Sequence, residues 1–301
     1  MSMLHVLLPS TQRTGALTDA MPWLLRGDHL PDAEAGYHAA LRGFFRTPAG
    51  SWPVAALTRD ALYGDAEGST WLGADLAFVQ PDLTGARLLA CGHLDISREE
   101  SAALAAELAP SFGDRGFVLE PSLPSRWHLR LPRGAQPPHF DDPEQVLGDD
   151  LLEHLPQGGD GRRWRALLTE TQVLLHQSDI NAQRQQRGQA PANSLWFWGG
   201  GALPAWVKSE LGLAISDEPV VRALATRSHV AHQVLPQFDA ATLKAHAQVL
   251  LDLEREADLT RWWPQLEALW REGHSLMLHA TSGERWQLKP GHRWRLWRRG
   301  R

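Results

Sequence analysis

The residue pattern with the clearest chemical potential lies between positions 181 and 204. An apolar run at 195–198 leads directly into three consecutive glycines at 199–201. In α/β folds ligands bind where strands end, and bare glycine backbone lets an anion approach main-chain N–H groups closely. The same glycines also fit a tight turn that needs them only for a positive φ angle. The sequence leaves both interpretations open.

Other side chains of catalytic type give weaker patterns. His229 and His232 would share one face of a helix, but no acidic third metal ligand accompanies them, so ordinary histidines are the simpler interpretation. Cys91 has no His and Asn partners in a recognisable arrangement and is expected to be a small buried residue. The acidic run at 141–150 is typical of a solvated linker rather than a cation site.

The end of the chain is basic and aromatic. Residues 285–301 contain seven Lys or Arg and no acid, whereas the whole chain has a net charge of −5. The pattern predicts a hairpin over 286–296 that turns at Pro290 and Gly291. Such a hairpin could bind nucleic acid or an acidic protein, but we favour an edge strand whose Trp286, Trp294 and Leu296 face inward.

The remaining pattern predicts the elements that must position these residues. Ser97 and Glu100 form a capping box for a helix that Pro110 is expected to end, and a second helix begins near position 162. Residues 132–161 are expected to form a mobile connection or hinge. Strands are predicted at 5–8, 74–79, 87–90, 116–120, 127–131, 195–198, 248–251 and 275–278, with a helix at 262–270. This mixed order indicates an α/β architecture.

The composition is that of a folded protein, with 43% hydrophobic and 22% charged residues in 301. A single cysteine excludes an internal disulfide framework. No apolar run approaches the ~20 residues that cross a bilayer, and the first residues do not form a signal peptide. We therefore expect a cytoplasmic protein with no membrane contact.

Several segments together resemble one family. Residues 193–199, Asn-Ser-Leu-Trp-Phe-Trp-Gly, resemble the P-A-N-x-x-W-x-W-G-x-G signature of the archaeal-type, cofactor-independent phosphoglycerate mutases of the alkaline-phosphatase-like superfamily. Residues 96–100 and 137–139 resemble the family's I-S-x-E-E and P-P-H-D elements, and the similarity extends over residues 54–221. More narrowly, the chain resembles the RpfE-type regulatory proteins of proteobacteria.

The resemblance implies phosphoryl transfer through a Ser or Thr nucleophile, assisted by two divalent ions. The family's first acidic ligands follow its first strand, but here that strand leads into Pro9, Ser10 and Thr11. The ungapped match puts Trp52 at the nucleophile and leaves Ser51 one residue away, a weak candidate.

The later ligands of the family also depart from its pattern. The D-H-x-T strand end reads Leu278-His-Ala-Thr281, and the basic D-R-R-A-G-R phosphate-binding run is replaced at 90–95. The remaining acidic ligand would come from a small group of candidates, namely Asp252, Glu254, Glu256 and Asp258. The sequence therefore predicts that the scaffold is kept and that the metal cage is lost.

These observations predict an α/β fold in which an alkaline-phosphatase-like core sheet flanked by helices, residues 1–69 and 191–301, carries an inserted α+β domain at 70–190.

The expected function is that of a degenerate phosphoglycerate-mutase-like protein with a regulatory or scaffold role, no catalytic residue, no metal and no cofactor. The alternatives are a phosphomutase or phosphatase that uses Mn²⁺, Zn²⁺ or Mg²⁺, and a nucleic-acid-binding protein. A protein partner is expected, with a small anion as a further ligand of the cleft. The candidate ligand-binding residues are His139, Arg184, Asn193, Trp196, Trp198, Gly199, Gly200 and Gly201.

Overall fold

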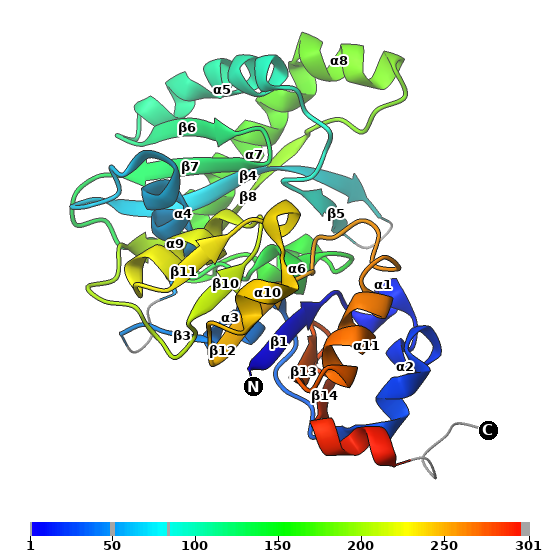
Figure 1. Cartoon of the computed structure of the whole chain (residues 1–301). Helices are drawn as coiled ribbons and strands as arrows, with labels where there is room; N and C mark the ends of the chain where they lie inside the picture. Colours follow the sequence, from blue (N-terminus) through cyan, green and yellow to red (C-terminus); the bar gives the residue numbers. More distant parts are fainter. Residues whose placement is uncertain (1, 49–51, 83–84, 296–301) are drawn as a thin grey trace. The chain divides into compact units, whose positions relative to one another are not determined.

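The computed structural model describes residues 2–48, 52–82 and 85–295 (Figure 1). The chain divides into two compact units. Unit 1 comprises Met1–Pro48 and Trp206–Arg301, and unit 2 comprises Ala49–Ala205. Unit 2 thus begins before position 70 and ends after position 190, because the helix at 54–63 and the strand at 194–202 pack within it.

Unit 1 is built on a seven-stranded sheet in the order β11-β10-β12-β1-β13-β14-β2. The five strands from β11 to β13 are parallel, whereas β14 runs antiparallel to both β13 and β2. The strands are β1 (Met3–Leu8), β2 (Asp28–Leu30), β10 (Leu213–Ile215), β11 (Ala231–Gln233), β12 (Gln248–Asp252), β13 (Ser275–Ala280) and β14 (Arg285–Leu288). A two-stranded sheet joins β3 (Phe45–Arg46) to β9 (Lys208–Ser209).

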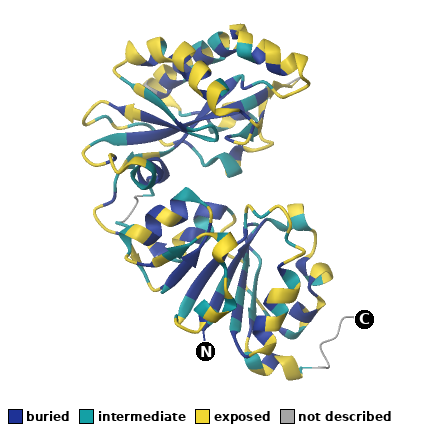
Figure 2. Cartoon of the chain, turned by 45° about the horizontal axis from the view of Figure 1, so that its top comes forward, coloured by how far each residue is buried: buried dark blue, intermediate teal, exposed yellow. Residues whose placement is uncertain are grey.

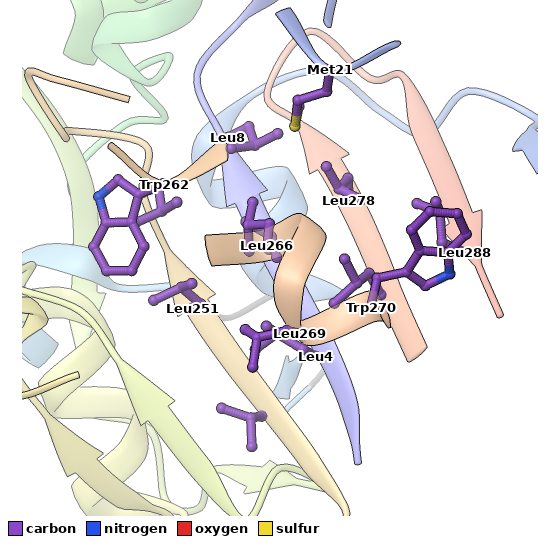
Figure 3. Close-up of a cluster of buried hydrophobic side chains, with 14 of the residues drawn as sticks. Leu4, Leu8, Met21, Leu251, Trp262, Leu266, Leu269, Trp270, Leu278 and Leu288 are labelled. Atoms are coloured by element: carbon purple, nitrogen blue, oxygen red, sulfur yellow. The ribbon is translucent and has the colours of Figure 1, made fainter. Parts of the chain in front are cut away.

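A large hydrophobic cluster of unit 1 lies on one face of this sheet. Side chains alternate along a strand, so Leu4 and Leu8 of β1 point to the same face. They pack against α11 (Trp263–Arg271), whose Leu266 and Trp270 are fully buried (Figure 3). The other helices of unit 1 are α1 (Thr11–Thr14), α2 (Leu17–Ala20), η1 (Pro22–Arg26), α3 (Tyr37–Arg42), α9 (Pro219–Arg227), η3 (Leu235–Gln237), α10 (Ala240–Leu243) and η4 (Pro290–Trp294).

The predicted C-terminal hairpin is wrong. β14 ends at Leu288, and Pro290 begins the 3₁₀ helix η4 instead of a turn, since proline is well suited to the first turn of a helix. The strand is not at the sheet edge either, because β2 pairs with it. Trp294 is 67% exposed rather than inward-facing, and Leu296 lies outside the described residues. Whether this end binds nucleic acid stays a prediction.

Unit 2 is an α+β unit whose antiparallel sheet runs β5-β4-β7-β6, with β8 also paired to β4. Its strands are β4 (Thr70–Pro81), β5 (Ala86–Cys91), β6 (Val118–Leu123), β7 (Arg126–Leu131) and β8 (Ser194–Ala202). Its helices are α4 (Val54–Tyr63), α5 (Arg98–Gly113), α6 (Pro143–Val146), η2 (Leu151–His154), α7 (Gly158–Gln177) and α8 (Asp179–Gln186). In both units the central strands, β1 and β12 in unit 1 and β4 and β8 in unit 2, are mostly buried, and the helices expose their outer faces (Figure 2).

Two expectations for unit 2 are wrong. The capping box of Ser97 and Glu100 is present, but α5 continues through Pro110 because the buried Phe112 holds the last turn in the core. Residues 132–161 are not a free hinge, since Val146 is fully buried and Leu147 bridges to β5. Cys91 is half-buried rather than buried.

The α/β fold class with an inserted α+β part is confirmed. No helix among the described residues combines the length and the apolar character that a membrane span requires.

Candidate functional site

The candidate site of unit 1 is the edge where its parallel strands end. The registers of β1, β12, β13 and β10 bring their carboxyl ends together, so the residues that follow them become neighbours (Figure 1). Asp252 ends β12, Ser216 follows β10, and Thr281 follows β13. Polar residues far apart in the sequence therefore meet at this edge.

The buried carboxyl group of Asp252 is the centre of this edge. Its Oδ2 accepts hydrogen bonds from the hydroxyls of Tyr37 and Ser216, both at 2.7 Å. Its Oδ1 accepts one from the main-chain N–H of Glu254 at 3.2 Å. Burial raises the pKa of Asp252 to about 6, although the hydroxyl donors pull it down. Burial and the nearby carboxyl also raise the pKa of Tyr37 well above its usual value.

Two further carboxylates at this edge share one guanidinium. Nε of Arg255 lies 3.1 Å from Oε1 of Glu218 and 3.5 Å from Oε2 of Glu254. Both acidic side chains are less than one-fifth exposed. A cation of the protein itself therefore offsets part of the negative charge of these two acids.

The ends of β1 and β13 carry hydroxyl groups. The Oγ1 of Thr11 donates to Oε1 of Glu284 at 2.7 Å, and the Oγ of Ser282 donates to its Oε2. The main-chain N–H of Thr11 also donates to Ser282 Oγ at 3.0 Å. The net pKa of Glu284 is lowered, because these hydrogen bonds outweigh the effect of burial, which by itself would raise the pKa. The carboxylate therefore stays charged.

These residues do not fit a cage for two divalent ions. Such ions need several open oxygen or imidazole ligands, but hydroxyl groups donate to Oδ2 of Asp252 and to both oxygens of Glu284, and a main-chain N–H donates to Oδ1 of Asp252. Within residues 2–48, 52–82 and 85–295, no three His, Cys, Asp or Glu side chains are grouped in a way that would hold a metal. We therefore derive no metal-assisted step.

A histidine pair lies on the sheet face opposite the main core of unit 1. Nδ1 of His5 is 3.3 Å from Nε2 of His279, and Phe44 meets both rings edge-on at 5.1 and 5.2 Å. Burial lowers the pKa of His5, and it lowers the pKa of His279 to about 3, so both rings are neutral. They line a cavity of about 460 Å³ with Arg42 and Arg285.

His229 and His232 do not share a helix face. His229 lies after α9 with a φ of 58°, whereas His232 lies on β11. The Nε2 of His232 is 2.9 Å from the carbonyl oxygen of Ser216. The helical interpretation of this pair is wrong because α9 ends before it.

The glycines of unit 2 continue a strand and do not form a turn. Residues 199–202 belong to β8, and their φ angles are positive at Gly199 (60°) and Gly201 (149°). A Cβ at Gly199 would lie 3.0 Å from Val54, and one at Gly201 would lie 2.9 Å from Pro53. A Cβ at Gly200 would lie 2.8 Å from a methyl group of Leu72. Glycine is needed here for close packing of the strand.

The two predicted tryptophans are buried and bonded within unit 2. The indole N–H of Trp196 donates to the carbonyl of Asp141 at 3.0 Å, and that of Trp198 donates to Asp75 Oδ2 at 2.9 Å. Asp75 Oδ1 also accepts the main-chain N–H of Trp127 at 2.8 Å, so this carboxylate joins β4, β7 and β8. Asp75 was not among the residues expected from the sequence, because its only sequence signal is a charged residue inside an apolar strand.

The other candidates have mixed environments. Arg184 is fully buried, whereas the side chain of His139 is 87% exposed, with Nε2 3.3 Å from Asp141 Oδ1. Asp141 also accepts from His154 at 2.8 Å, so the acidic run is folded and not a solvated linker. Ser51 lies outside the described residues. Their predicted ligand contacts stay predictions.

Asn193 extends the pairing between β8 and β4. Its side-chain Oδ1 accepts the N–H of Val79 at 2.8 Å, and its Nδ2 donates to the carbonyl of Val79 at 2.7 Å. We expect Asn193→Ala to lower the free energy of unfolding by ~2 kcal/mol, because both main-chain groups lose a partner. Urea denaturation would measure this, and an unchanged unfolding curve would show that the amide pair contributes nothing.

The chain matches no protein-family model. It is 32% identical over 120 residues to a 2,3-bisphosphoglycerate-independent phosphoglycerate mutase from Methanosarcina barkeri. That match covers 38% of this chain and 28% of the relative, so the chain spans less than a third of it in the match. Part of this chain is therefore homologous to phosphoglycerate mutases.

Solved structures resemble the chain over more of its length. The match to the PH0037 protein from Pyrococcus horikoshii covers 96% of this chain and 87% of the PH0037 chain, with a TM-score of 0.51 and 12% identity. The match to a cofactor-independent phosphoglycerate mutase from Thermoplasma acidophilum DSM 1728 covers 96% of this chain and 90% of the mutase chain, with a TM-score of 0.42 and 17% identity. The chain therefore shares its fold with the PH0037 protein.

Proposed function

We propose that this protein is a degenerate relative of the phosphoglycerate mutases that has lost the two-metal site and acts as a regulatory or scaffold protein. The RpfE-type regulatory proteins, which the sequence resembles, offer a functional parallel, and the expected partner is another protein. One observation carries the proposal: Oδ2 of Asp252 is taken by the hydroxyls of Tyr37 and Ser216.

The electrostatics of Asp252 support this proposal. Burial raises the pKa of Asp252 to about 6, and Tyr37 and Ser216 donate hydrogen bonds to its Oδ2. The acids next to it, Glu218 and Glu254, lie beside Arg255. These three acids are therefore already in contact with hydroxyl or guanidinium groups of the protein.

The partial homology to phosphoglycerate mutases favours a second candidate function, a metal-dependent phosphomutase or phosphatase. That function would need a nucleophile, for which Ser51 is the sequence candidate, and Mn²⁺, Zn²⁺ or Mg²⁺. It would also need the hydroxyl donors to move away from Asp252, so that this carboxylate could bind a metal ion.

One experiment separates the two functions. The full chain is incubated with Mn²⁺, desalted, and analysed for bound metal and for interconversion of phosphoglycerates, beside an active cofactor-independent phosphoglycerate mutase treated identically. We expect far less than one equivalent of metal and no conversion above background. Two tightly bound equivalents with turnover that Ser51→Ala abolishes would replace our proposal by the enzyme.

A further inference from the structure

Unit 2 contains a cavity that the candidate site does not use. It has a volume of about 570 Å³, within the range of small-molecule sites. It lies between the beginning of α7, the end of β7 and residues 135–137. Every residue that lines it belongs to unit 2. The cavity is thus a property of this unit alone.

One wall of the cavity is a supported aromatic stack. The rings of Phe117 and Trp164 are 5.5 Å apart and inclined by only 14°. Phe140 and Phe197 meet the Trp164 ring edge-on at 5.5 and 5.0 Å, which fixes its orientation. Such a wall is already ordered, so a flat ligand can pack against it without the cost of fixing a mobile side chain.

The rest of the lining is apolar with a basic rim. Leu131 and Leu167 are 4% and 1% exposed and add aliphatic surface. Among the described residues that line the cavity, Arg115 and Arg163 are the charged ones. These two guanidinium groups can donate charge-assisted hydrogen bonds to an anion at the rim.

The position of Arg115 is already fixed. Its Nη2 lies 2.7 Å from Oε2 of Glu170, and its Nη1 donates to the carbonyl of Ser111 at 2.6 Å. The ion pair is more than one-third exposed, and such surface pairs contribute only ~0–1 kcal/mol. A carboxylate at the rim can therefore share this guanidinium at little cost.

We propose that this cavity binds a small organic acid with a flat apolar body, an aromatic carboxylate. The ring packs against Phe117 and Trp164 above the leucines, and the carboxylate lies at the rim beside Arg115 and Arg163. Apolar burial supplies the attraction, and the charge-assisted contacts at the rim select the anion. This inference does not depend on the function proposed above.

The probe is 2-naphthoate, compared with its neutral analogue 2-naphthamide, by titration calorimetry on the full chain. We expect 2-naphthoate to bind with a Kd below ~1 mM and the amide to bind about tenfold more weakly, or ~1.4 kcal/mol. Equal affinities for the two probes, or no binding of 2-naphthoate at that concentration, would overturn the proposal.

Matched variants locate the site. Arg163→Gln removes a charge at the rim and is expected to weaken 2-naphthoate binding about fivefold without affecting the amide. Arg162→Gln removes the neighbouring exposed charge, which does not line the cavity, and should change neither affinity. Ala166→Leu narrows the cavity and should weaken both probes. Equal losses of 2-naphthoate affinity in Arg162→Gln and Arg163→Gln would show that the attraction is non-specific, and would refute the site.

Discussion

Replacement of Arg184 by alanine is expected to lower the free energy of unfolding by ~3–5 kcal/mol, the cost typical of breaking a buried ion pair. Its guanidinium is fully buried and lies 2.9 Å from Oε2 of Glu100. It also donates to the carbonyls of Leu94, Asp95 and Ala190, at 2.5, 3.2 and 3.1 Å. Alanine would leave these acceptors without a donor inside unit 2.

The control is Arg187→Ala, which removes the other guanidinium bound to Glu100. The side chain of Arg187 is 54% exposed, so its loss should cost less than ~1 kcal/mol. Both variants are compared with the unchanged chain by urea denaturation followed by circular dichroism. Similar losses in the two variants would contradict the structural role assigned to Arg184.

Asp252 is expected to make the stability of the protein depend on pH. Its pKa is about 6 in the folded protein, above the ordinary 3.8, so the folded state binds more protons between these values. The contribution of Asp252 to stability is therefore fully present below pH 4 and is lost as pH rises through 6. The shift corresponds to ~3 kcal/mol, at ~1.4 kcal/mol for each pKa unit.

This dependence is measured against Asp252→Asn, which cannot titrate. The free energy of unfolding of the original chain, minus that of the variant, should fall by ~3 kcal/mol between pH 4 and 7. Asp19→Asn removes an exposed carboxyl and controls for the loss of one charge. A difference that stays constant with pH would mean that burial does not raise the pKa of Asp252.

The candidate site shows where sequence reasoning succeeds and where it fails. The sequence itself shows that no acidic residue directly follows the first strand, because Ser10 and Thr11 stand at those positions. Asp252 was one of four candidate acids, and only the register of β12 places it at the edge beside Ser216. No sequence pattern indicated Tyr37, which lies 215 positions from Asp252.

The sequence by itself determined the local features of this protein. Alternating and continuous apolar runs located β1, β4, β7, β12 and β13, and the capping box of Ser97 located the start of α5, because such signals depend on neighbours within a few residues. The order of these elements was enough to predict the α/β class.

Only the tertiary structure decided which polar groups are paired. Asp75 meets Trp198, Arg184 meets Glu100, and His5 meets His279 across 123, 84 and 274 positions. Packing also placed the three glycines, for which a tight turn was one of two open interpretations, in a strand where Gly199 lets Val54 approach closely. A buried polar group is stabilised by the partner that the fold brings next to it, and the residues near that group in the sequence do not identify this partner.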